Sequence, residues 1–524
     1  MFSEVFILST TGKYLFRIAA VLPVAAAVLC SLAYIVIRST MFFYAEYALS
    51  EKVLAVFLIL AEGFVIVHGI GYALSVMKAS VYESKQLKIT HEPVNTQNTG
   101  SVAVLVAARH EPGEILESTF ITLNNLCYEN KTLYFLDDSS EEQYRKEAEE
   151  LADEYGLVLF RRTKPRHGAK AGIVNDCLET LKEDYVAIFD ADQNPMPDFL
   201  NQLIPYLEKD PGLAYIQTPQ YYSNISEMPV ARASAFQQAV FYEYICEGKS
   251  ISEAMFCCGT NVVFRTRALL DAGGFDETSI TEDFATSLKL LEKGWRSLYF
   301  PHVCVFGMAP ETLSAYFQQQ FRWAAGTLGV FRKLLLRFIV RPFSLKPLQW
   351  IEYFFSGSFY LVGGALFFLM LCPILYIFFN QPSFFAVPEV YLLAFVPYIV
   401  FSLSVFYVLL GKRRYKIKDL FLGQMLGVIT FPVYIKASFA ALFGFRLSFG
   451  VTSKGRDNAL AYLRLWPQLF MWFLNFIAVV WAVNRFIYEH QSAVVVNAVW
   501  AFYHFLLLSF VFYFNRGILC EQRV

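Results

Sequence analysis

Apolar and mixed segments alternate along the chain. Six runs are predominantly apolar and about as long as the roughly 17–25 residues that a helix needs to cross a bilayer. They are residues 18–37, 53–77, 350–379, 390–410, 467–483 and 493–514. The pattern predicts two membrane helices in residues 1–80, a central domain in residues 81–337, and four membrane helices in residues 338–524.

Two apolar segments contain residues that do not fit a plain membrane span. Residues 420–445 are interrupted by Gly423, Gly427, Pro432 and Lys436, and we interpret this segment as an amphipathic helix lying on the membrane. The second run contains Glu62, and a carboxylate within a span is costly. Either Glu62 belongs to a functional site, or it faces a neighbouring helix and is neutral or paired.

Strand-like and helix-like segments alternate in the central stretch. Four short apolar runs are typical of buried strands: residues 102–106, 132–136, 157–160 and 185–189. Residues 142–155 are charged and have a helical period. This alternation predicts one α/β domain with a largely parallel sheet, and the stretch is long enough to bury its own core.

The composition is that of a membrane protein. Of 524 residues, 56% are hydrophobic and 17% are aromatic, which is too apolar for a soluble protein. The net charge of −1 gives no indication of a nucleic-acid partner. The nine cysteines are scattered, so we expect free thiols, with neither a disulfide framework nor a zinc site.

Charges in the loops predict the orientation of the helices. Residues 411–418 contain five Lys or Arg residues, whereas residues 380–389 contain none. By the positive-inside rule, the first loop is cytosolic and the second lies outside. The basic residues 446–464 and the tail also lie inside, so six spans place both termini and the central domain in the cytosol. We expect a multi-pass protein of the plasma (inner) membrane, in contact with the lipid bilayer.

Acidic residues follow two of the predicted strands. Asp137 and Asp138 come after one strand, and Asp190 and Asp192 come after another. The carboxyl ends of parallel strands meet at one edge, where open α/β sheets bind ligands. Two carboxylates there can hold a hard divalent cation, which can hold a diphosphate. The alternative is a solvated strand exit that happens to be acidic.

Two further groups can serve the same edge. Lys170 stands in a small-residue turn at a predicted helix start, which suits a diphosphate, although it can also be a plain surface lysine. Glu282 and Asp283 follow Thr281 and a Gly-rich turn. One of these carboxylates can be a general base that takes a proton from a sugar hydroxyl, and the alternative is a helix N-cap.

Gln319, Arg322 and Trp323 are spaced to share one face of a helix. The Arg322 guanidinium can neutralise a leaving diphosphate, and the Trp323 ring offers a flat surface on which a pyranose can stack. A helix near the membrane that carries Trp and Arg can equally be an interfacial anchor.

These motifs occur in the order D, DxD, TED and QxxRW. This order resembles that of the processive membrane glycosyltransferases of family 2, which have a GT-A fold. The match is closer still to the bacterial cellulose synthases within that family. Residues 256–260, Phe-Cys-Cys-Gly-Thr, resemble the FFCGS acceptor stretch of those enzymes. Residues 449–455 fit their FxVTxK gating loop. The resemblance covers about residues 90–460.

The resemblance implies a role for each matched residue. Asp190 and Asp192 would hold Mg²⁺ or Mn²⁺, Asp137 would contact the uridine, and Asp283 would be the catalytic base. Trp323 would be the platform for the growing chain end. The remaining substrate-binding residues would be Arg109, Glu111, Asp138, Lys170, Cys258, Gly259, Thr260, Glu282, Gln319, Arg322, Phe449, Val451, Thr452 and Lys454. Of these, Lys170 and Arg322 would meet the phosphates, and Thr452 and Lys454 would close over the nucleotide.

Some positions depart from the family pattern. Arg109 stands near the place where the family often has a tyrosine that stacks on uracil, and two serines replace the two glycines after Asp138. Thr260 replaces a serine. We expect no C-terminal cyclic-di-GMP domain, because the chain ends soon after the sixth span. Activation by that messenger would need a partner protein.

We therefore expect a processive, inverting glucosyltransferase that polymerises UDP-glucose into a β-1,4-glucan and moves the nascent glucan across the membrane. A mixed-linkage β-1,3/1,4-glucan or β-1,3-glucan synthase is the first alternative, and a hyaluronan or chitin synthase the next. The alternative outside the enzymes is a transporter whose α/β domain only binds a nucleotide. An accessory membrane or periplasmic subunit would be a further partner.

Overall fold

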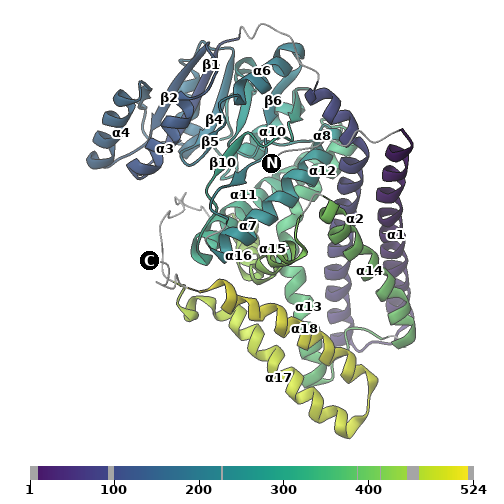
Figure 1. The fold of residues 1–524 in the computed structure, drawn as a ribbon. Helices are drawn as coiled ribbons and strands as arrows, with labels where there is room; N and C mark the ends of the chain where they lie inside the picture. Colours follow the sequence, from purple (N-terminus) through teal and green to yellow (C-terminus); the bar gives the residue numbers. More distant parts are fainter. Residues whose placement is uncertain are drawn as a thin grey trace.

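The computed structural model describes residues 10–91, 100–225, 228–385, 388–412, 415–444 and 459–516. An α/β domain built around a twisted sheet lies at one end of the molecule, and long helices extend away from it (Figure 1). The domain comes from the middle of the chain, and the long helices come from both ends. This arrangement has the order that the apolar pattern predicts.

The main sheet has seven strands in the order β3-β2-β1-β4-β8-β6-β9. The strands are β1 (Val102–Ala108), β2 (Lys131–Asp137), β3 (Val158–Phe160), β4 (Tyr185–Asp190), β6 (Leu213–Gln217), β8 (Val262–Arg265) and β9 (Arg296–Tyr299). Strands β1 to β4 pair with one another in parallel, and β8 is antiparallel to both β4 and β6. The four strands predicted from the sequence are confirmed as the parallel half, and β8 links them to two strands that the prediction did not include.

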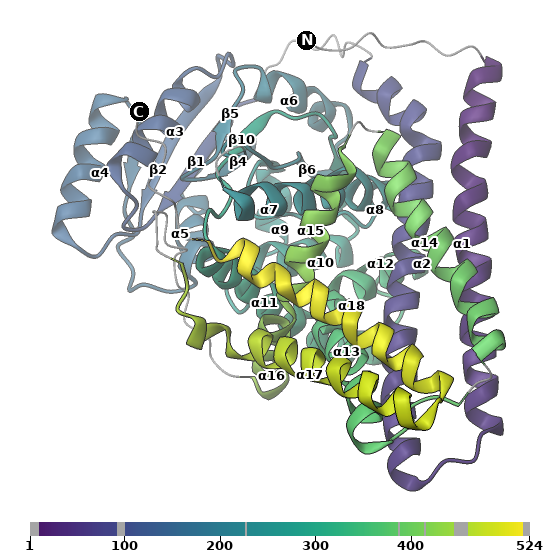
Figure 2. The same cartoon turned by 60° about the horizontal axis from the view of Figure 1, so that its bottom comes forward.

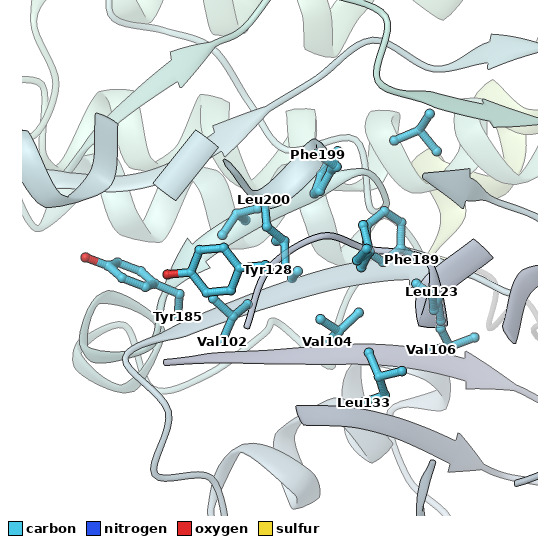
Figure 3. Packing of buried hydrophobic residues seen from close by; sticks show 14 of the residues in the cluster. Val102, Val104, Val106, Leu123, Tyr128, Leu133, Tyr185, Phe189, Phe199 and Leu200 are labelled. Atoms are coloured by element: carbon cyan, nitrogen blue, oxygen red, sulfur yellow. The ribbon is translucent and has the colours of Figure 1, made fainter. Parts of the chain in front are cut away.

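Both faces of the sheet are covered, which explains why its strands are continuous apolar runs. On one face Val104 and Phe189 pack with Phe199 in a large buried cluster (Figure 3). On the other face Leu105 and Ile188 pack in a second cluster. Successive side chains of a strand point to opposite faces, so neighbours in β1 and β4 are divided between the two clusters.

Helices and a small second sheet complete this domain. The helices are α3 (Gly113–Asn124), α4 (Glu142–Glu154), α5 (Ala169–Leu178), α6 (Phe199–Lys209), α9 (Thr266–Asp271), α10 (Glu282–Glu292) and α11 (Leu313–Val340). The small sheet consists of β5 (Asn194–Pro195), β10 (Val305–Gly307) and β7 (Tyr221–Tyr222). Helix α7 (Pro229–Val240), the π-helix η1 (Phe241–Cys246) and α8 (Glu247–Ile251) follow one another without a break.

Six helices of the described residues are long and apolar enough to cross a membrane, as the sequence predicts. These stretches are Val21–Tyr44, Leu49–Ser80, Pro347–Phe379, Glu389–Tyr407, Tyr462–Glu489 and Ser492–Phe514. They lie in α1 (Thr10–Tyr44), α2 (Leu49–His91), α12 (Pro347–Ser358) with α13 (Val362–Phe379), α14 (Pro388–Lys412), α17 (Trp466–Glu489) and α18 (Ser492–Phe514). Figure 2 shows α1, α2 and α14 as neighbours, with α17 beside α18.

The segment predicted as one amphipathic surface helix has a different form. It contains α15 (Ile417–Ile429) and α16 (Phe431–Phe443), which meet at a bend of 48°. Taken together, the two helices are also long and apolar enough to form a broken span or a re-entrant loop. Pro432 stands in the first turn of α16, where its missing N–H costs little, so it favours a new helix start at this bend.

Glu62 is paired, which confirms the second of the two alternatives for this residue. Its Oε2 atom lies 2.7 Å from Arg38 Nε, and its Oε1 atom accepts a hydrogen bond of 3.0 Å from the Tyr34 hydroxyl. Helices α1 and α2 are therefore joined by a charged pair, with the Arg38 side chain 2% exposed. Pairing offsets the cost of placing these charges between apolar helices.

The α/β domain is attached directly to the C-terminal helices. Arg232 of α7 binds Asp419 of α15 through Nε and Nη2 at 2.8 and 3.0 Å. Gln237 of α7 donates a 2.6 Å hydrogen bond to the Gly423 carbonyl oxygen. Helix α11 packs along α16. The domain boundaries predicted at residues 80 and 337 both fall inside helices, because α2 continues to His91 and α11 to Val340.

Candidate active site

The acids that follow β2 and β4 lie at one edge of the sheet, as the sequence predicts. Asp137 is paired in register with Ala108, and Asp190 with Ala107. Strand β1 lies between β2 and β4, and all three run in parallel. Asp138 and Asp192 come just after these strand ends, and both are partly buried. This acidic edge is the frame of the candidate site.

Lys170 is bound to one of these acids and is not a free surface lysine. It lies in the first turn of α5, and its ammonium group forms an ion pair with Asp190. It also donates a 2.7 Å hydrogen bond to the Gly259 carbonyl oxygen. Burial works against the charge of Lys170, but Asp190 and Glu282 outweigh it and raise the pKa of the lysine. One cation therefore ties the acidic edge to residues 256–260.

Residues 256–260 are held to the sheet by buried polar contacts. The Thr260 hydroxyl accepts a 2.9 Å hydrogen bond from the Asp190 backbone N–H. Gln217 at the end of β6 accepts from the Cys258 N–H at 2.8 Å and donates to the Thr260 carbonyl oxygen at 2.8 Å. Gln217 is fully buried and was not predicted as a site residue, because a single glutamine at a strand end carries no motif.

The two carboxylates of the TED motif begin helix α10, directly beside this stretch. A Cβ atom added to Gly259 would lie 3.2 Å from Asp283 Oδ2, and the φ angle of Gly259 is +82°. Both facts favour glycine there. Thr281 occupies the N-cap position, but its side chain makes no capping hydrogen bond. The Asp283 carboxylate accepts a 2.8 Å hydrogen bond from the backbone N–H of the next residue, Phe284.

Burial raises the pKa of both Glu282 and Asp283 above the ordinary range of carboxylic acids. The charge of Lys170 lowers both values, and the charge of Asp190 raises them. The environment thus favours a pair that shares a proton near neutral pH, so that one member can accept a proton. A raised carboxylate pKa of this kind is the pattern expected for a general base.

Helix α11 brings the QxxRW motif to the same place. A Cβ atom on Gly326 would lie 2.6 Å from Thr281 Cγ2, so α11 and the start of α10 are in direct contact. Burial lowers the pKa of Arg322, and the nearby charges of Asp190 and Glu282 raise it. Arg322 is therefore close enough to the acidic edge to interact with its charges. Trp323 is partly buried one position further along the helix.

Gln319, the first residue of that motif, faces Tyr222 of the small sheet. Burial raises the pKa of the Tyr222 hydroxyl, as does the charge of Asp192, and hydrogen bonding to Gln238 and Gln319 opposes this rise. Tyr222 is 6% exposed. Tyr222 therefore lies near both Asp192 and the helix that carries Arg322, although no sequence motif indicated this residue.

Asp137 and Asp138 hold a basic loop in place. Asp137 accepts hydrogen bonds from Arg161 Nε at 2.8 Å and from the Ser139 N–H at 2.9 Å. Asp138 lies 3.0 Å from Arg162 Nε and 2.9 Å from Arg166 Nε. The run Arg161-Arg162 with Arg166 was the available sequence signal for these contacts, and the motif-based prediction did not use it.

Residues 109–111 directly follow β1, whose end lies between the ends of β2 and β4. The Arg109 Nε atom is buried without a hydrogen-bond partner within the described residues. His110 has a φ angle of +56°, and its Nε2 atom accepts a 3.0 Å hydrogen bond from the Ser140 N–H. Glu111 is partly buried. The strained His110 backbone is the kind of conformation that clusters at binding sites.

The predicted gating residues lie outside the described residues. Phe449, Val451, Thr452 and Lys454 all fall within residues 445–458. The end of α16, just before them, is bound to α11, because Arg332 Nη1 donates 3.3 Å hydrogen bonds to the carbonyl oxygens of Ala441 and Leu442. Arg332 is on the helix that carries Trp323.

The chain is similar in sequence to known glycosyltransferases. Residues 185–410 match the model of "Glycosyl transferase family group 2". The chain is 27% identical over 424 residues to the "Cellulose synthase catalytic subunit [UDP-forming]" of Pseudomonas fluorescens, covering 78% of this chain and 56% of that protein. It is 31% identical over 248 residues to the protein of that name from Xanthomonas axonopodis pv. citri, covering 46% and 33%.

Two other matches are shorter or more distant. A UDP-forming cellulose synthase catalytic subunit of Dictyostelium discoideum is 41% identical over 179 residues, 33% of this chain and 17% of that protein. A mannosyltransferase structure from Pyrobaculum calidifontis, in complex with GDP-Man and Mn²⁺, is 17% identical with a TM-score of 0.48, covering 74% of this chain and 100% of that one.

The chain spans from about a sixth to just over half of the length of the three curated relatives described here. The matched residues 185–410 begin with β4 and include the DxD, TED and QxxRW motifs. Residues 185–410 are thus similar to glycosyl transferase family group 2, and the chain is similar over most of its length to cellulose synthase catalytic subunits.

Proposed function

We propose that the chain is a processive, inverting glycosyltransferase that polymerises UDP-glucose into a β-1,4-glucan and moves the glucan across the membrane. The observation that carries this proposal is the convergence of Asp190, Asp283 and Arg322 at one sheet edge. These residues come from three motifs far apart in the sequence. The names of the relatives support the choice of UDP-glucose and of a cellulose-like product.

The donor set at the edge fits a divalent cation. Asp190 and Asp192 offer carboxylate oxygens, the ligands that Mg²⁺ and Mn²⁺ prefer. Within the described ranges, no group of three or more His, Cys, Asp or Glu side chains could hold a metal ion. Phosphate oxygens and water would therefore complete the coordination, as is usual for Mg²⁺. When bound, the ion would supply positive charge to the leaving diphosphate.

Two side chains of the protein would act on the same diphosphate. Lys170 at the start of α5 and Arg322 on α11 are both cationic and lie near Asp190. Each would donate hydrogen bonds to phosphate oxygens, and these bonds strengthen as the sugar–phosphate bond breaks and negative charge develops. Burial makes such interactions stronger than they would be in water.

Asp283 would act as the base. It would take the proton from an acceptor hydroxyl while that oxygen forms a bond to the anomeric carbon and the bond to UDP breaks. Attack from the face opposite to UDP inverts the anomeric configuration. Asp283 lies against Gly259, which places it beside residues 256–260. Trp323 would carry the terminal sugar of the acceptor on its ring.

The six apolar helices support the translocation part of the proposal. Helix α11 carries the QxxRW motif and packs along α16, and α13 contacts α16 and α18. The helix that carries the acceptor platform is thus connected through α16 to helices that are long enough to cross a membrane. A chain extended at Trp323 would leave the site toward these helices.

The test uses the full chain in nanodiscs with Mg²⁺ and isotopically labelled UDP-glucose. We expect release of UDP together with a glucose polymer, and no polymer from UDP-N-acetylglucosamine or UDP-glucuronate. A polymer made from either or both of those donors instead would indicate a chitin or hyaluronan synthase. Nucleotide binding without UDP release from any of the donors would indicate a transporter, and the proposal would be wrong.

A further inference from the structure

The first turns of α12 pack against the α/β domain and not against lipid. Trp350 and Tyr353 are 4% and 1% exposed, and Gln349 and Glu352 are 6% and 5% exposed. Residues that are spaced by three or four positions lie on one face of a helix. A stretch that the sequence assigns to the start of a membrane helix therefore presents a polar and aromatic face to the catalytic domain.

Glu352 is the centre of this contact. Its Oε2 atom lies 3.0 Å from Lys249 Nζ, and its Oε1 atom lies 2.9 Å from Lys78 Nζ. Oε1 also accepts a 3.0 Å hydrogen bond from the Ser252 hydroxyl. Lys249 reaches the Glu352 carbonyl oxygen as well, at 2.9 Å. One carboxylate thus joins α12, α8 and the membrane helix α2.

The neighbouring residues of α12 strengthen the same contact. Gln349 Nε2 donates a 2.7 Å hydrogen bond to the Glu253 carbonyl oxygen, and Lys346 forms an ion pair with the Glu253 carboxylate. The Tyr353 ring stacks on Phe284 with centroids 5.1 Å apart, and Phe284 directly follows the proposed base. Helix α12 therefore contacts both the chain before the acceptor stretch and the start of α10.

Helix α8 has little freedom to move away from α2. A Cβ atom on Gly248 would lie 3.0 Å from the Cα, Cβ and carbonyl oxygen of Ser75, so the two helices touch through their backbones. Lys78 lies one turn further along α2 and donates a 2.8 Å hydrogen bond to the Ser252 hydroxyl. The end of α8 is held from two sides, by α2 and by α12.

The held segment leads directly into the active site. Residues 252–255 connect α8 to the acceptor stretch, residues 256–260, and Phe256 packs against Phe284 with ring centroids 5.0 Å apart. The Cys257 N–H donates a 2.7 Å hydrogen bond to Ser287, one turn after Asp283 in α10. A shift of α8 would therefore move the acceptor stretch relative to the base.

We propose that Glu352 is a positioning residue for acceptor transfer: with Lys249, Ser252 and Lys78 it fixes the acceptor stretch against α10, so that the growing chain and not water receives the sugar. This inference rests on the proposed function. It concerns the acceptor side of the site, since Glu352 makes no contact with Lys170, Asp190 or Arg322 among its hydrogen bonds and ion pairs.

The measurable consequence is the fate of the transferred glucose. In transfer, the bond from the anomeric carbon to the UDP oxygen breaks and a bond to a chain hydroxyl forms. In hydrolysis, the new bond is to a water oxygen, so free glucose appears with UDP. Both reactions use the same leaving group and base. A poorly positioned acceptor therefore raises the ratio of free glucose to polymer, whereas a general loss of the folded site lowers both products.

The experiment compares Glu352→Gln with the wild-type chain in nanodiscs. We expect polymer synthesis to fall by about 10–100-fold, because misplacement of an acceptor by about 1 Å can cost that much. The ratio of free glucose to polymer should rise several-fold, and inhibition by UDP should stay within about twofold of wild type, because donor contacts are untouched. An unchanged ratio in folded Glu352→Gln, or UDP inhibition that weakens in parallel with synthesis, would overturn the inference.

Ser252→Ala is the second variant, and it decides the question if Glu352→Gln does not fold. It keeps both lysine contacts of Glu352 and removes the hydrogen bonds of the Ser252 hydroxyl with Glu352, Lys78 and the Gly248 carbonyl oxygen. The same ratio should therefore rise by at least about fivefold, the equivalent of one such bond. An unchanged ratio would contradict the proposal. Lys293→Gln is the matched control. Its ion pair with Asp271 is exposed, and Lys293 lies at the opposite end of α10 from Asp283. This variant should behave as wild type.

The products of the wild-type chain distinguish a failure of the proposed function from a failure of the role proposed for Glu352. If wild type transfers no glucose from UDP-glucose to a polymer, the proposed function itself is wrong. If wild type makes polymer and the variants keep its product ratio, only the role of Glu352 is wrong.

Discussion

Two lysine–carboxylate pairs lie at opposite ends of the acceptor stretch, and they differ in solvent access. In the first, Lys170 pairs with Asp190, whose side chain is 43% exposed. In the second, Lys249 pairs with Glu352, and the two side chains are 4% and 6% exposed. The chemical groups are the same, but solvent and ligands can reach only the first pair.

This difference in solvent access suits the two pairs to different roles. In the proposed mechanism, Asp190 would exchange its lysine for a metal ion, because its side chain is partly exposed, and Lys170 would then turn to a phosphate. Glu352 has three side-chain donors around it and no such access, so its contacts persist while the chemistry proceeds. The acceptor stretch is therefore held at one end by a fixed clamp and at the other by an exchangeable one.

The largest effect is expected for the base beside the exchangeable pair. Asp283→Asn should lower polymer synthesis by about 10²–10⁴-fold, the usual cost of losing a positioned base. Binding of UDP, measured by isothermal titration in detergent, should be nearly unchanged. A variant that keeps more than about a tenth of the wild-type rate would show that another group is the base.

The fixed pair should matter more for stability than the exchangeable one. Glu352→Gln leaves two lysines around a neutral amide, and breaking a buried pair in this way costs about 3–5 kcal/mol. Asp190→Asn should cost about 0–1 kcal/mol, because the carboxylate is partly solvated. Thermal unfolding of the two variants in one detergent checks this order, and equal melting temperatures would remove the distinction between the pairs.

Replacing Lys170 should separate metal binding from turnover. In Lys170→Met, no ammonium group competes for Asp190, so Mn²⁺ should bind more tightly in the absence of nucleotide. The expected gain in affinity is about tenfold, which corresponds to the loss of one competing charge contact of about 1.4 kcal/mol. Polymer synthesis should fall, because a phosphate contact is lost. Titration with Mn²⁺ followed by electron paramagnetic resonance measures the first effect. Weaker Mn²⁺ binding would mean that Lys170 does not compete for Asp190.

The smallest effect concerns pH. Burial raises the pKa of Asp283, and the base must be deprotonated, so kcat/KM should begin to fall on acidification well above the pH of about 4 expected for an exposed aspartate. The charge of Lys170 lowers this pKa, so Lys170→Met should move the acidic limb to higher pH. A limb that stays in place in this variant would indicate that the two groups are not coupled.

The residues around the exchangeable pair, Lys170 and Asp190, could be predicted from the sequence. The fixed pair, Lys249 and Glu352, could not. Asp190, Asp283 and Arg322 stand in motifs, and strand order alone brings Asp137 and Asp190 to one edge. These features depend on local patterns, namely strand ends and helix starts. The fold class followed from the same local signals, as did the six apolar helices.

Features that depend on tertiary contacts could not be predicted in this way. Glu352 and Lys249 are about 100 residues apart, and neither belongs to a motif. Strand β8 has only four residues, too few for its antiparallel pairing to be read from its pattern. Tyr222 stands in a two-residue strand whose position depends on β10. Each of these was decided by packing between distant segments.

The central claim is that this active site joins glucose units from UDP-glucose through β-1,4 bonds. The most direct measurement is linkage analysis, by methylation and mass spectrometry, of the polymer that the purified chain makes from labelled UDP-glucose with Mg²⁺. We predict 4-linked glucose throughout, degraded by a β-1,4-specific glucanase. A polymer of 3-linked glucose, a mixture of 3- and 4-linked units, or no polymer despite bound nucleotide would contradict the claim.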